Sequence, residues 1–408
     1  MVFNKQIKYH AGTNDDIQPK LKAATNSLLL NSSFIDNSGL MHGKMGISIY
    51  FFHLARQTGN PIYEDYAGEL IDEIYDEITI NTPADFENGL AGIGWGIEYL
   101  VQEGFIEADT DEVLEEFDNK IFKELIYNPS KKIGLLNGLV GLGVYLLKRL
   151  QNSSSSDEKI STLTNKQVLI HFIDELEGLT VSTSGIIDEP LKGQLTQAPK
   201  SLTSNQPTAN SQIKSKLIFD ITWEYPILLW ILAELHNQNL LNFKVEKIIQ
   251  FLIDPLINKN NFPKLHSNRL LLALALTRLL KIIKADQITS GHSDSQSLKQ
   301  SNIKLIIDNL LKKINRNTIE SELLPGDITI RHGTSGIAWI YMQLHRLAGG
   351  GHFRNEMEYW IDKLSIYEDK DSLLTCGYTG GDNIFGILEG LAGIMLLAKP
   401  IKKEVLKQ

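Results

Sequence analysis

Seven short segments of the sequence share one pattern, and each places a polar side chain at the same position. In five of them a polar residue precedes a G-x-x-G pair and an apolar run, as in Arg331-His-Gly-Thr-Ser-Gly-Ile-Ala338. Two more segments, residues 224–232 and 265–273, keep the polar residue and the apolar run but lack both glycines. The residues directly before the first glycine position are His42, Asn88, Asn137, Tyr225, His266, His332 and Glu389. The position before that one adds Glu87, Glu224 and Arg331.

These side chains offer imidazole, carboxylate, phenol and guanidinium groups, which transfer protons, bind metal ions or hold anions. A binding or proton-transfer role is therefore one interpretation, above all for Arg331 and His332. The other interpretation is structural. On that view Asn88 and Asn137 cap helix starts, and the glycines let neighbouring helices approach closely.

The elements that must position these residues are predicted to be helices. The apolar run that follows each polar residue is typical of a helix buried on all sides, and the segments between the runs are amphipathic and belong on the outside. The amphipathic segments are residues 63–80, 109–127, 165–179, 245–257, 303–314 and 355–365. Strand patterns are absent. We expect an all-α fold, an α/α toroid of seven inner and seven outer helices. Its inner helix starts would ring a cavity mouth and offer N–H groups to anions.

Composition narrows the class of protein. The 408 residues are 42% hydrophobic and 22% charged with one cysteine, which fits a globular protein without internal disulfides. A net charge of −9 argues against nucleic acid as the main partner. No signal peptide or membrane span is evident, so we expect a cytoplasmic protein. We expect a single domain over residues 1–408, with loop insertions at 181–216 and 288–302.

The repeats, the Phe86-Glu-Asn-Gly-Leu-Ala-Gly-Ile-Gly-Trp95 segment and the closing Leu388-Glu-Gly-Leu-Ala-Gly-Ile394 resemble the lanthionine synthetase C-like family from about Leu40 to Pro400. The resemblance implies an α/α toroid with a zinc ion in its cavity. It also implies thioether cyclisation of a ribosomally made precursor peptide, with a dehydratase as a further partner. There a zinc-bound cysteine thiolate of the peptide attacks a dehydrated residue.

Several positions depart from the family pattern. Leu265 and Arg331 stand where the family has its two zinc cysteines, and Tyr225-Pro226 replaces a histidine–glycine pair. The family's third-repeat aspartate falls at Gly134. We therefore expect no tightly bound zinc and no other cofactor, with His332, Cys376 and His266 as the residual metal candidates. Candidate catalytic residues are His332, Arg331, Tyr225 and His266. The candidate mouth of the substrate cavity consists of His42, Glu87, Asn88, Asn137, Glu224 and Glu389.

Three functions remain open from the sequence. The first is modification of a ribosomally made peptide, either as a divergent cyclase or as a peptide-binding or accessory subunit. The second is an α/α-toroid glycoside hydrolase that uses cavity carboxylates from Glu87, Glu224 and Glu389. The third is a structural or interaction role. In the first of these, Arg331 is expected to pair with Glu224 or with an anionic group of the peptide, in place of the missing ion.

Overall fold

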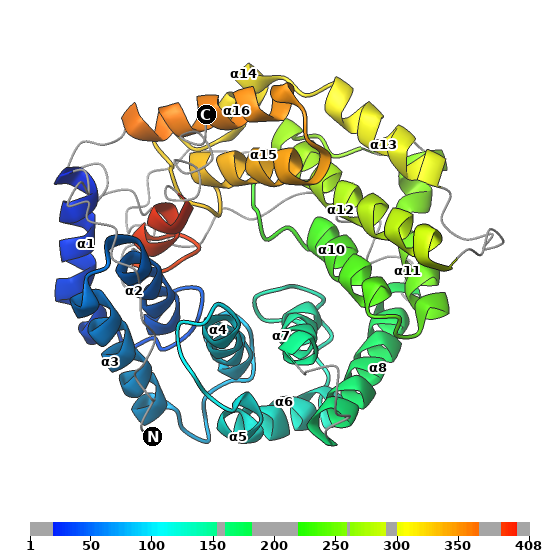
Figure 1. Ribbon diagram of the computed structural model, residues 1–408. Helices are drawn as coiled ribbons and strands as arrows, with labels where there is room; N and C mark the ends of the chain where they lie inside the picture. Colours follow the sequence, from blue (N-terminus) through cyan, green and yellow to red (C-terminus); the bar gives the residue numbers. More distant parts are fainter. Residues whose placement is uncertain are drawn as a thin grey trace, which may run out of the picture. The chain divides into compact units, whose positions relative to one another are not determined.

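The described part of the chain is built from helices alone (Figure 1). The computed structural model describes residues 19–152, 160–181, 219–258, 262–290, 300–366 and 385–397, and these ranges contain no strand. The predicted all-α class is confirmed. No helix in these ranges combines the length and the apolar character that crossing a membrane requires.

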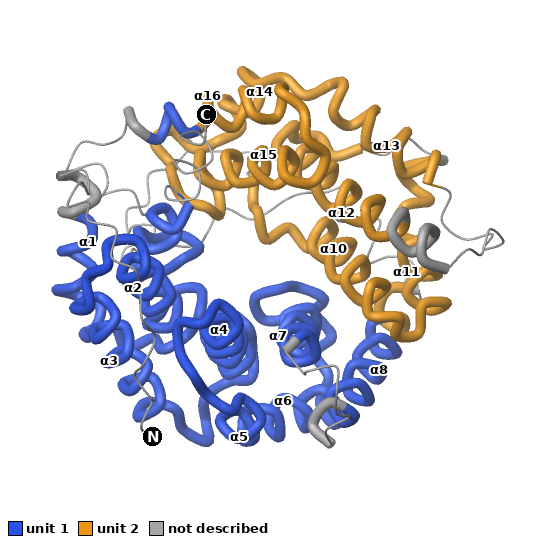
Figure 2. The backbone as a smooth tube through the Cα atoms, viewed as in Figure 1, with its two compact units in different colours: residues 1–176, 361–408 blue, residues 177–360 orange. Residues whose placement is uncertain are grey.

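The helices group into two compact units, coloured separately in Figure 2. Unit 1 comprises residues 1–176 and 361–408, and unit 2 comprises residues 177–360. The single-domain prediction stays a prediction. Unit 1 contains α1 (Pro19–Asn31), the 3-10 helix η1 (Ser32–Phe34), α2 (Lys44–Thr58), α3 (Pro61–Glu77), α4 (Leu90–Gln102), α5 (Thr110–Val113), α6 (Glu115–Tyr127), α7 (Leu139–Asn152) and helical residues 391–397. Unit 2 contains α10 (Glu224–Asn237), α11 (Asn242–Asn258), α12 (His266–Ser290), α13 (Gln300–Lys312), α14 (Arg316–Glu322) and α15 (Thr334–Ala348). The helices α8 (Ile160–Val181) and α16 (Gly351–Ile366) each cross a boundary between the units.

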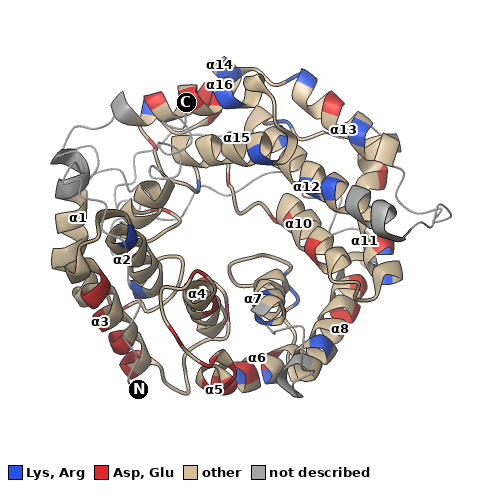
Figure 3. Cartoon of the chain, in the orientation of Figure 1, with Lys and Arg blue, Asp and Glu red and all other residues tan. Residues whose placement is uncertain are grey.

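Unit 1 has two layers. The helices α2, α4 and α7 pack side by side, while α3 packs on α2 and α6 packs on α4. Nearly every residue of α4 from Leu90 to Leu100 is buried, whereas α3 buries only one stripe. Figure 3 shows acidic residues along α3 and α5. The predicted division into apolar inner and amphipathic outer helices is therefore confirmed within this unit.

Buried charges join the two layers of unit 1. In α7, Arg149 is 3% exposed and binds Glu98 of α4 at 2.5 Å and Asp118 of α6 at 2.8 Å. In α2, Lys44 binds Glu73 and Glu77 of α3. Burial alone would lower the pKa of Lys44, but its hydrogen bonds to the two carboxylates outweigh this effect and raise it. These pairs hold inner helices to outer ones.

Unit 2 repeats the layering with α10, α12 and α15. The helix α12 packs against both of the others, α11 packs on α10, and α13 and α14 pack on α12. The longest apolar run of the sequence, residues 270–276, is buried throughout in α12. The arrangement within each unit is the two-layered packing that an α/α toroid predicts.

Some predicted boundaries need correction. The segment 109–127 forms two helices, because the chain breaks at Leu114 between α5 and α6. Asp109 caps the first of them by accepting a hydrogen bond from the N–H of Asp111 at 3.0 Å. The predicted loop 288–302 is helical at both ends, which belong to α12 and α13. Val181 is the last residue of α8, and residues 182–216 and 291–299 lie outside the described ranges.

The glycine pairs serve the backbone of the loop before each inner helix. A Cβ atom on Gly46, Gly92, Gly141 or Gly336 would overlap the carbonyl oxygen of the residue six positions earlier. Carbonyl groups of the same loops accept hydrogen bonds from the first helical N–H groups, as in Leu90 N to Pro83 O at 2.9 Å. Equivalent bonds run from Lys44 N to Asn37 O (2.8 Å), Leu139 N to Lys132 O (2.8 Å) and Thr334 N to Asp327 O (3.0 Å). The expectation that these helix starts offer N–H groups to anions is therefore wrong for α2, α4, α7 and α15, since the loop already satisfies their leading donors.

Candidate functional site

The loop that carries Arg331 and His332 is a rigid turn before α15. Asp327 opens it, and its Oδ1 accepts hydrogen bonds from Thr329 N at 2.8 Å and from Thr329 Oγ1 at 2.7 Å. The hydroxyl of Thr329 accepts in turn from the N–H of His332 at 3.2 Å. Gly333 lies so close to Asp327 that any side chain there would collide with it. The backbone of Arg331 and His332 is thus fixed by its own turn.

A second segment, residues 219–223 before α10, runs alongside this turn. The N–H of Ile221 donates to the carbonyl of Arg331 at 2.9 Å. The Nε of Arg331 lies 3.3 Å from Oδ2 of Asp220, which makes an ion pair. This pairing corrects the prediction that Glu224 is the carboxylate partner of Arg331, whereas the predicted pairing with an anionic group of a peptide stays a prediction. Glu224 itself is the first residue of α10. It is exposed overall, yet desolvation of its carboxyl group raises its pKa.

The same segment orients the imidazole of His332. Its Nδ1 lies 2.7 Å from the carbonyl oxygen of Phe219, and a carbonyl only accepts, so Nδ1 carries the proton. In the neutral ring, Nε2 then has a lone pair available as a hydrogen-bond acceptor. Arg331 and His332 are both half-buried. Together they present a guanidinium and an acceptor nitrogen at fixed positions, suited to the carbonyl, carboxylate and N–H groups of a peptide.

The described residues at the family's zinc positions do not fit a zinc site. A zinc site of the family type needs three protein ligands. Leu265 has no lone pair and is 8% exposed, and Arg331 is a permanent cation engaged with a carboxylate. Within the described ranges, no group of three His, Cys, Asp or Glu side chains is arranged to hold a metal ion. Cys376, the residual thiol candidate, lies outside the described residues.

Two further predicted catalytic residues have structural partners of their own. Tyr225 is 3% exposed, and its hydroxyl donates to the carbonyl of Leu252 in α11. Burial raises the pKa of Tyr225, so the hydroxyl stays protonated. His266 accepts a hydrogen bond at Nδ1 from the N–H of Asn315 at 3.0 Å. His266 therefore lies with the loop before α14, whereas the ring of His332 is held by the segment before α10.

The predicted residues of unit 1 lie in loops that are joined to one another. His42 is buried, and its Nε2 lies 3.1 Å from Oε1 of Glu87. Asn88 does not cap α4, because the N-cap is Gly89; its Oδ1 accepts instead from Nδ2 of Asn37 at 2.8 Å. That correction replaces the capping prediction for Asn88. The side chain of Glu87 contacts this histidine. The glycoside-hydrolase interpretation, in which Glu87 is one of the cavity carboxylates, stays a prediction.

Backbone hydrogen bonds connect these loops in one repeated way. Ile387 N donates to Met41 O at 2.9 Å, Met41 N donates to Glu87 O at 3.1 Å, and Glu87 N donates to Leu136 O at 3.0 Å. Asn137, which is exposed, and Glu389, which is buried, lie in the loops at the two ends of this series. That the candidate residues of both units border a single cavity mouth stays a prediction.

Sequence reasoning missed Asp220, Asp327 and Glu322. A signal for the first two was present, since the tripeptide Asp-Ile-Thr begins at both aspartates, six residues before the first glycine position of its segment. Asn37 holds the same place in the first segment. Each of these three side chains accepts from the N–H two residues on at 2.8 Å, a turn typical of Asp and Asn. Glu322 gave no local signal, because it acts on a helix start more than fifty residues away in sequence.

The family model described as lanthionine synthetase C-like protein matches residues 35–200 and 291–404. The unmatched stretch between them, residues 201–290, holds α10, α11 and α12 and thus both segments that have lost their glycine pairs. A search of the curated proteins finds no match. Because the matched residues make up more than half of the sequence, the chain belongs to the lanthionine synthetase C-like family.

Proposed function

We propose that this protein binds a ribosomally made precursor peptide and takes part in its modification as a peptide-binding subunit. Membership of the lanthionine synthetase C-like family supports a peptide ligand. The observation that carries the proposal is the Arg331–Asp220 ion pair beside His332. It puts a charged, hydrogen-bonding group at the position where the family resemblance implies a zinc cysteine.

The roles of the individual residues follow from their contacts. A peptide carboxylate can compete with Asp220 for the guanidinium of Arg331, because an arginine–aspartate pair with partial solvent access is exchangeable. His332 accepts a peptide N–H at Nε2 while Phe219 keeps the ring in place. No step of this binding needs a metal ion. We propose a dehydratase as the partner that delivers the peptide. We also propose a cytoplasmic location, which suits a chain with a single cysteine.

Peptide binding is the first test. The probe is a synthetic Cys/Ser/Thr-rich peptide with a free C-terminal carboxylate, labelled at its N-terminus for fluorescence anisotropy. Arg331→Ala should weaken its binding about tenfold, as loss of a charge-assisted contact does. Arg354→Ala is the matched control, since Arg354 is also an arginine of unit 2 paired with a carboxylate, Glu358 at 2.9 Å. Equal losses in both variants, or no binding by the wild type, would overturn the proposal.

Elemental analysis is the second test. The purified wild-type chain should contain much less than one zinc ion per molecule, and His332→Ala should leave that content unchanged. In the separate peptide-binding assay, Asp220→Asn should weaken binding less than Arg331→Ala, because the guanidinium remains. About one zinc ion per chain that disappears in His332→Ala would show that a metal site exists, and Cys376 would then be the next ligand to test, because a cysteine thiolate binds zinc.

A further inference from the structure

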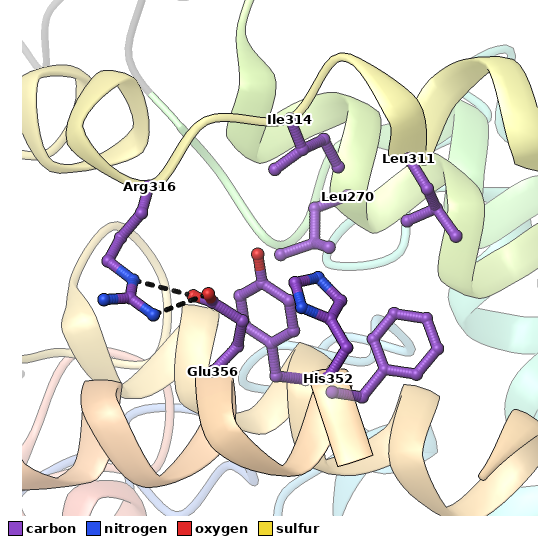
Figure 4. A pocket seen from close by; sticks show the side chains of 8 residues that line it. Leu270, Leu311, Ile314, Arg316, His352 and Glu356 are labelled. Atoms are coloured by element: carbon purple, nitrogen blue, oxygen red, sulfur yellow. Dashed lines mark hydrogen bonds and ion pairs between the residues drawn. The ribbon is translucent and has the colours of Figure 1, made fainter. Parts of the chain in front are cut away.

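A small cavity lies in unit 2 between α12, α13, α15 and α16 (Figure 4). Leu270, Leu311 and Ile314 form its apolar side. Figure 4 shows these three side chains facing Glu356 and His352 across the cavity. None of the lining residues belongs to the loop of Arg331 and His332, so the cavity is separate from the site described above.

The cavity wall includes the polar side chain of Tyr341. Tyr341 of α15 is 2% exposed, and its hydroxyl has no hydrogen-bond partner within the described part of the chain. It is not one of the fully enclosed polar atoms that lack a partner, so its oxygen stays accessible to a water-sized group. Burial, followed by the charge of Glu356, raises the pKa of Tyr341, so the group stays a neutral donor. A water-sized group can bond to this hydroxyl, and a ligand that displaces such a group has to replace its hydrogen bond. A ligand that fills the cavity therefore has to bring a polar atom for this hydroxyl.

The charged group in the cavity wall is held rigid. Arg316 binds Glu356 with both prongs of its guanidinium, Nε to Oε2 at 3.0 Å and Nη2 to Oε1 at 2.6 Å (Figure 4). The guanidinium also lies 3.8 Å from the ring centroid of Tyr359. Because the ion pair and the ring contact act together, the carboxylate is fixed before a ligand arrives.

The size of the cavity decides the class of ligand. Its volume is about 50 Å³. Pockets for cofactors and drug-sized molecules measure about 300–1,000 Å³, so neither fits. One water-sized group needs about 10–15 Å³, so there is room for about three or four such groups. A threonine or valine side chain has three atoms beyond Cα, whereas phenylalanine has seven.

We propose that this cavity is a recognition pocket for a threonine side chain of a peptide. The methyl group meets the three aliphatic side chains, and the hydroxyl accepts from Tyr341 and donates to the carboxylate of Glu356. Valine has the same shape but leaves the Tyr341 hydroxyl unsatisfied. The pocket would thus select by one oxygen atom.

The test compares two probes on the full-length chain, N-acetyl-threonine methylamide and N-acetyl-valine methylamide, by saturation-transfer NMR. Wild type should bind the threonine probe about fivefold more tightly, the value of one hydrogen bond. Tyr341→Phe should bring the ratio to about one, and Leu311→Trp, which fills the cavity, should abolish binding of both probes. Tyr359→Phe is the control, since that hydroxyl binds Glu320 instead.

Three results would overturn the proposal. They are equal affinities in the wild type, a ratio that survives Tyr341→Phe, and absence of saturable binding at millimolar probe, which is expected of a cavity that holds only ordered water. The wild-type ratio needs no variant, so a variant that fails to fold leaves the test intact. Arg331→Ala should not change the ratio, which separates this pocket from the proposed peptide site.

Discussion

The starts of α4 in unit 1 and α12 in unit 2 satisfy the same free backbone donors with different atoms. At α4, carbonyl groups of the preceding loop bond to the N–H groups of Leu90 and Ala91 at 2.9 and 3.3 Å. At α12, the carboxylate of Glu322 accepts from the N–H groups of His266 and Ser267 at 2.7 and 2.9 Å. The first solution requires glycine because two backbones nearly touch, and the second does not. The glycine pair is therefore a requirement of backbone capping.

The start of α10 combines features of the other two helix starts. Its loop keeps the turn at Asp220, with Thr222 N donating to Oδ1 at 2.8 Å, as in the glycine-containing segment of Arg331. Pro226 stands at the first glycine position and has no N–H group, so one donor that needs capping is gone. Loss of the glycines thus leaves the loop turn in place and changes how the helix start is satisfied.

The largest expected effect comes from filling the backbone contact at α4. Gly92→Ala places a Cβ against the carbonyl of Phe86 and 3.0 Å from Cβ of Leu40, so the loop must shift. We expect a loss of about 3 kcal/mol in the free energy of unfolding, measured by urea denaturation. Gly68→Ala in α3 is the control, since nothing lies within 4 Å of its added Cβ. There alanine should stabilise the helix by about 0.5–1 kcal/mol. Equal effects at both positions would refute the steric account.

An intermediate effect is expected from removing the side-chain cap of α12. Glu322 is 8% exposed and bonds to two N–H groups and to the Ser267 hydroxyl. Glu322→Ala should cost about 2 kcal/mol, since a charged cap and buried hydrogen bonds are lost together. Asp308→Asn on the exposed face of α13 is the matched control and should change the midpoint very little. A loss confined to less than about 0.5 kcal/mol would mean that water caps α12 equally well.

The smallest effect concerns Tyr225 at the start of α10 and depends on pH. Tyr225→Phe removes one buried hydrogen bond, so it should cost about 1 kcal/mol at neutral pH. Burial raises the pKa of Tyr225 above its ordinary value of 10.0. Above pH 10 the unfolded chain therefore loses a proton that the folded chain keeps, and the wild type loses stability as pH rises. The phenylalanine variant lacks this loss, and the stability gap should shrink above pH 10. A gap that is constant with pH would contradict a buried, protonated Tyr225.

The helices were predictable from the sequence because their signals are local. An all-apolar run such as 270–276 has to be buried wherever it stands, and a striped segment such as 63–80 has to lie outside it. The break at Leu114 was not predictable, because the apolar spacing continues across it. The glycine pair predicts a close approach to a neighbouring helix, whereas the nearest atoms in the structure belong to the backbone of the preceding loop.

The candidate site was predictable only in part. Arg331 and His332 follow from their place in the repeat, whereas their partners Asp220 and Phe219 come from a loop more than a hundred residues earlier. The column that predicted His332 also predicted His266, yet a side chain from α14 draws the start of α12 to different neighbours. A repeat pattern predicts the backbone conformation at a position. Which side chains contact that position depends on residues far away in the sequence, which the repeat does not show.

The hydrogen bond between Ile387 and Met41 has a consequence for synthesis. A ribosome makes α2 early, yet the residue that covers Gly46 in unit 1 emerges on the order of 300 residues later. At about 5–20 residues per second, that interval lasts about 15–60 seconds. During this time the edge of α2 is an open apolar surface that neighbouring nascent chains can reach. We therefore expect the packing of the first repeat to be completed only after residue 387 has been made.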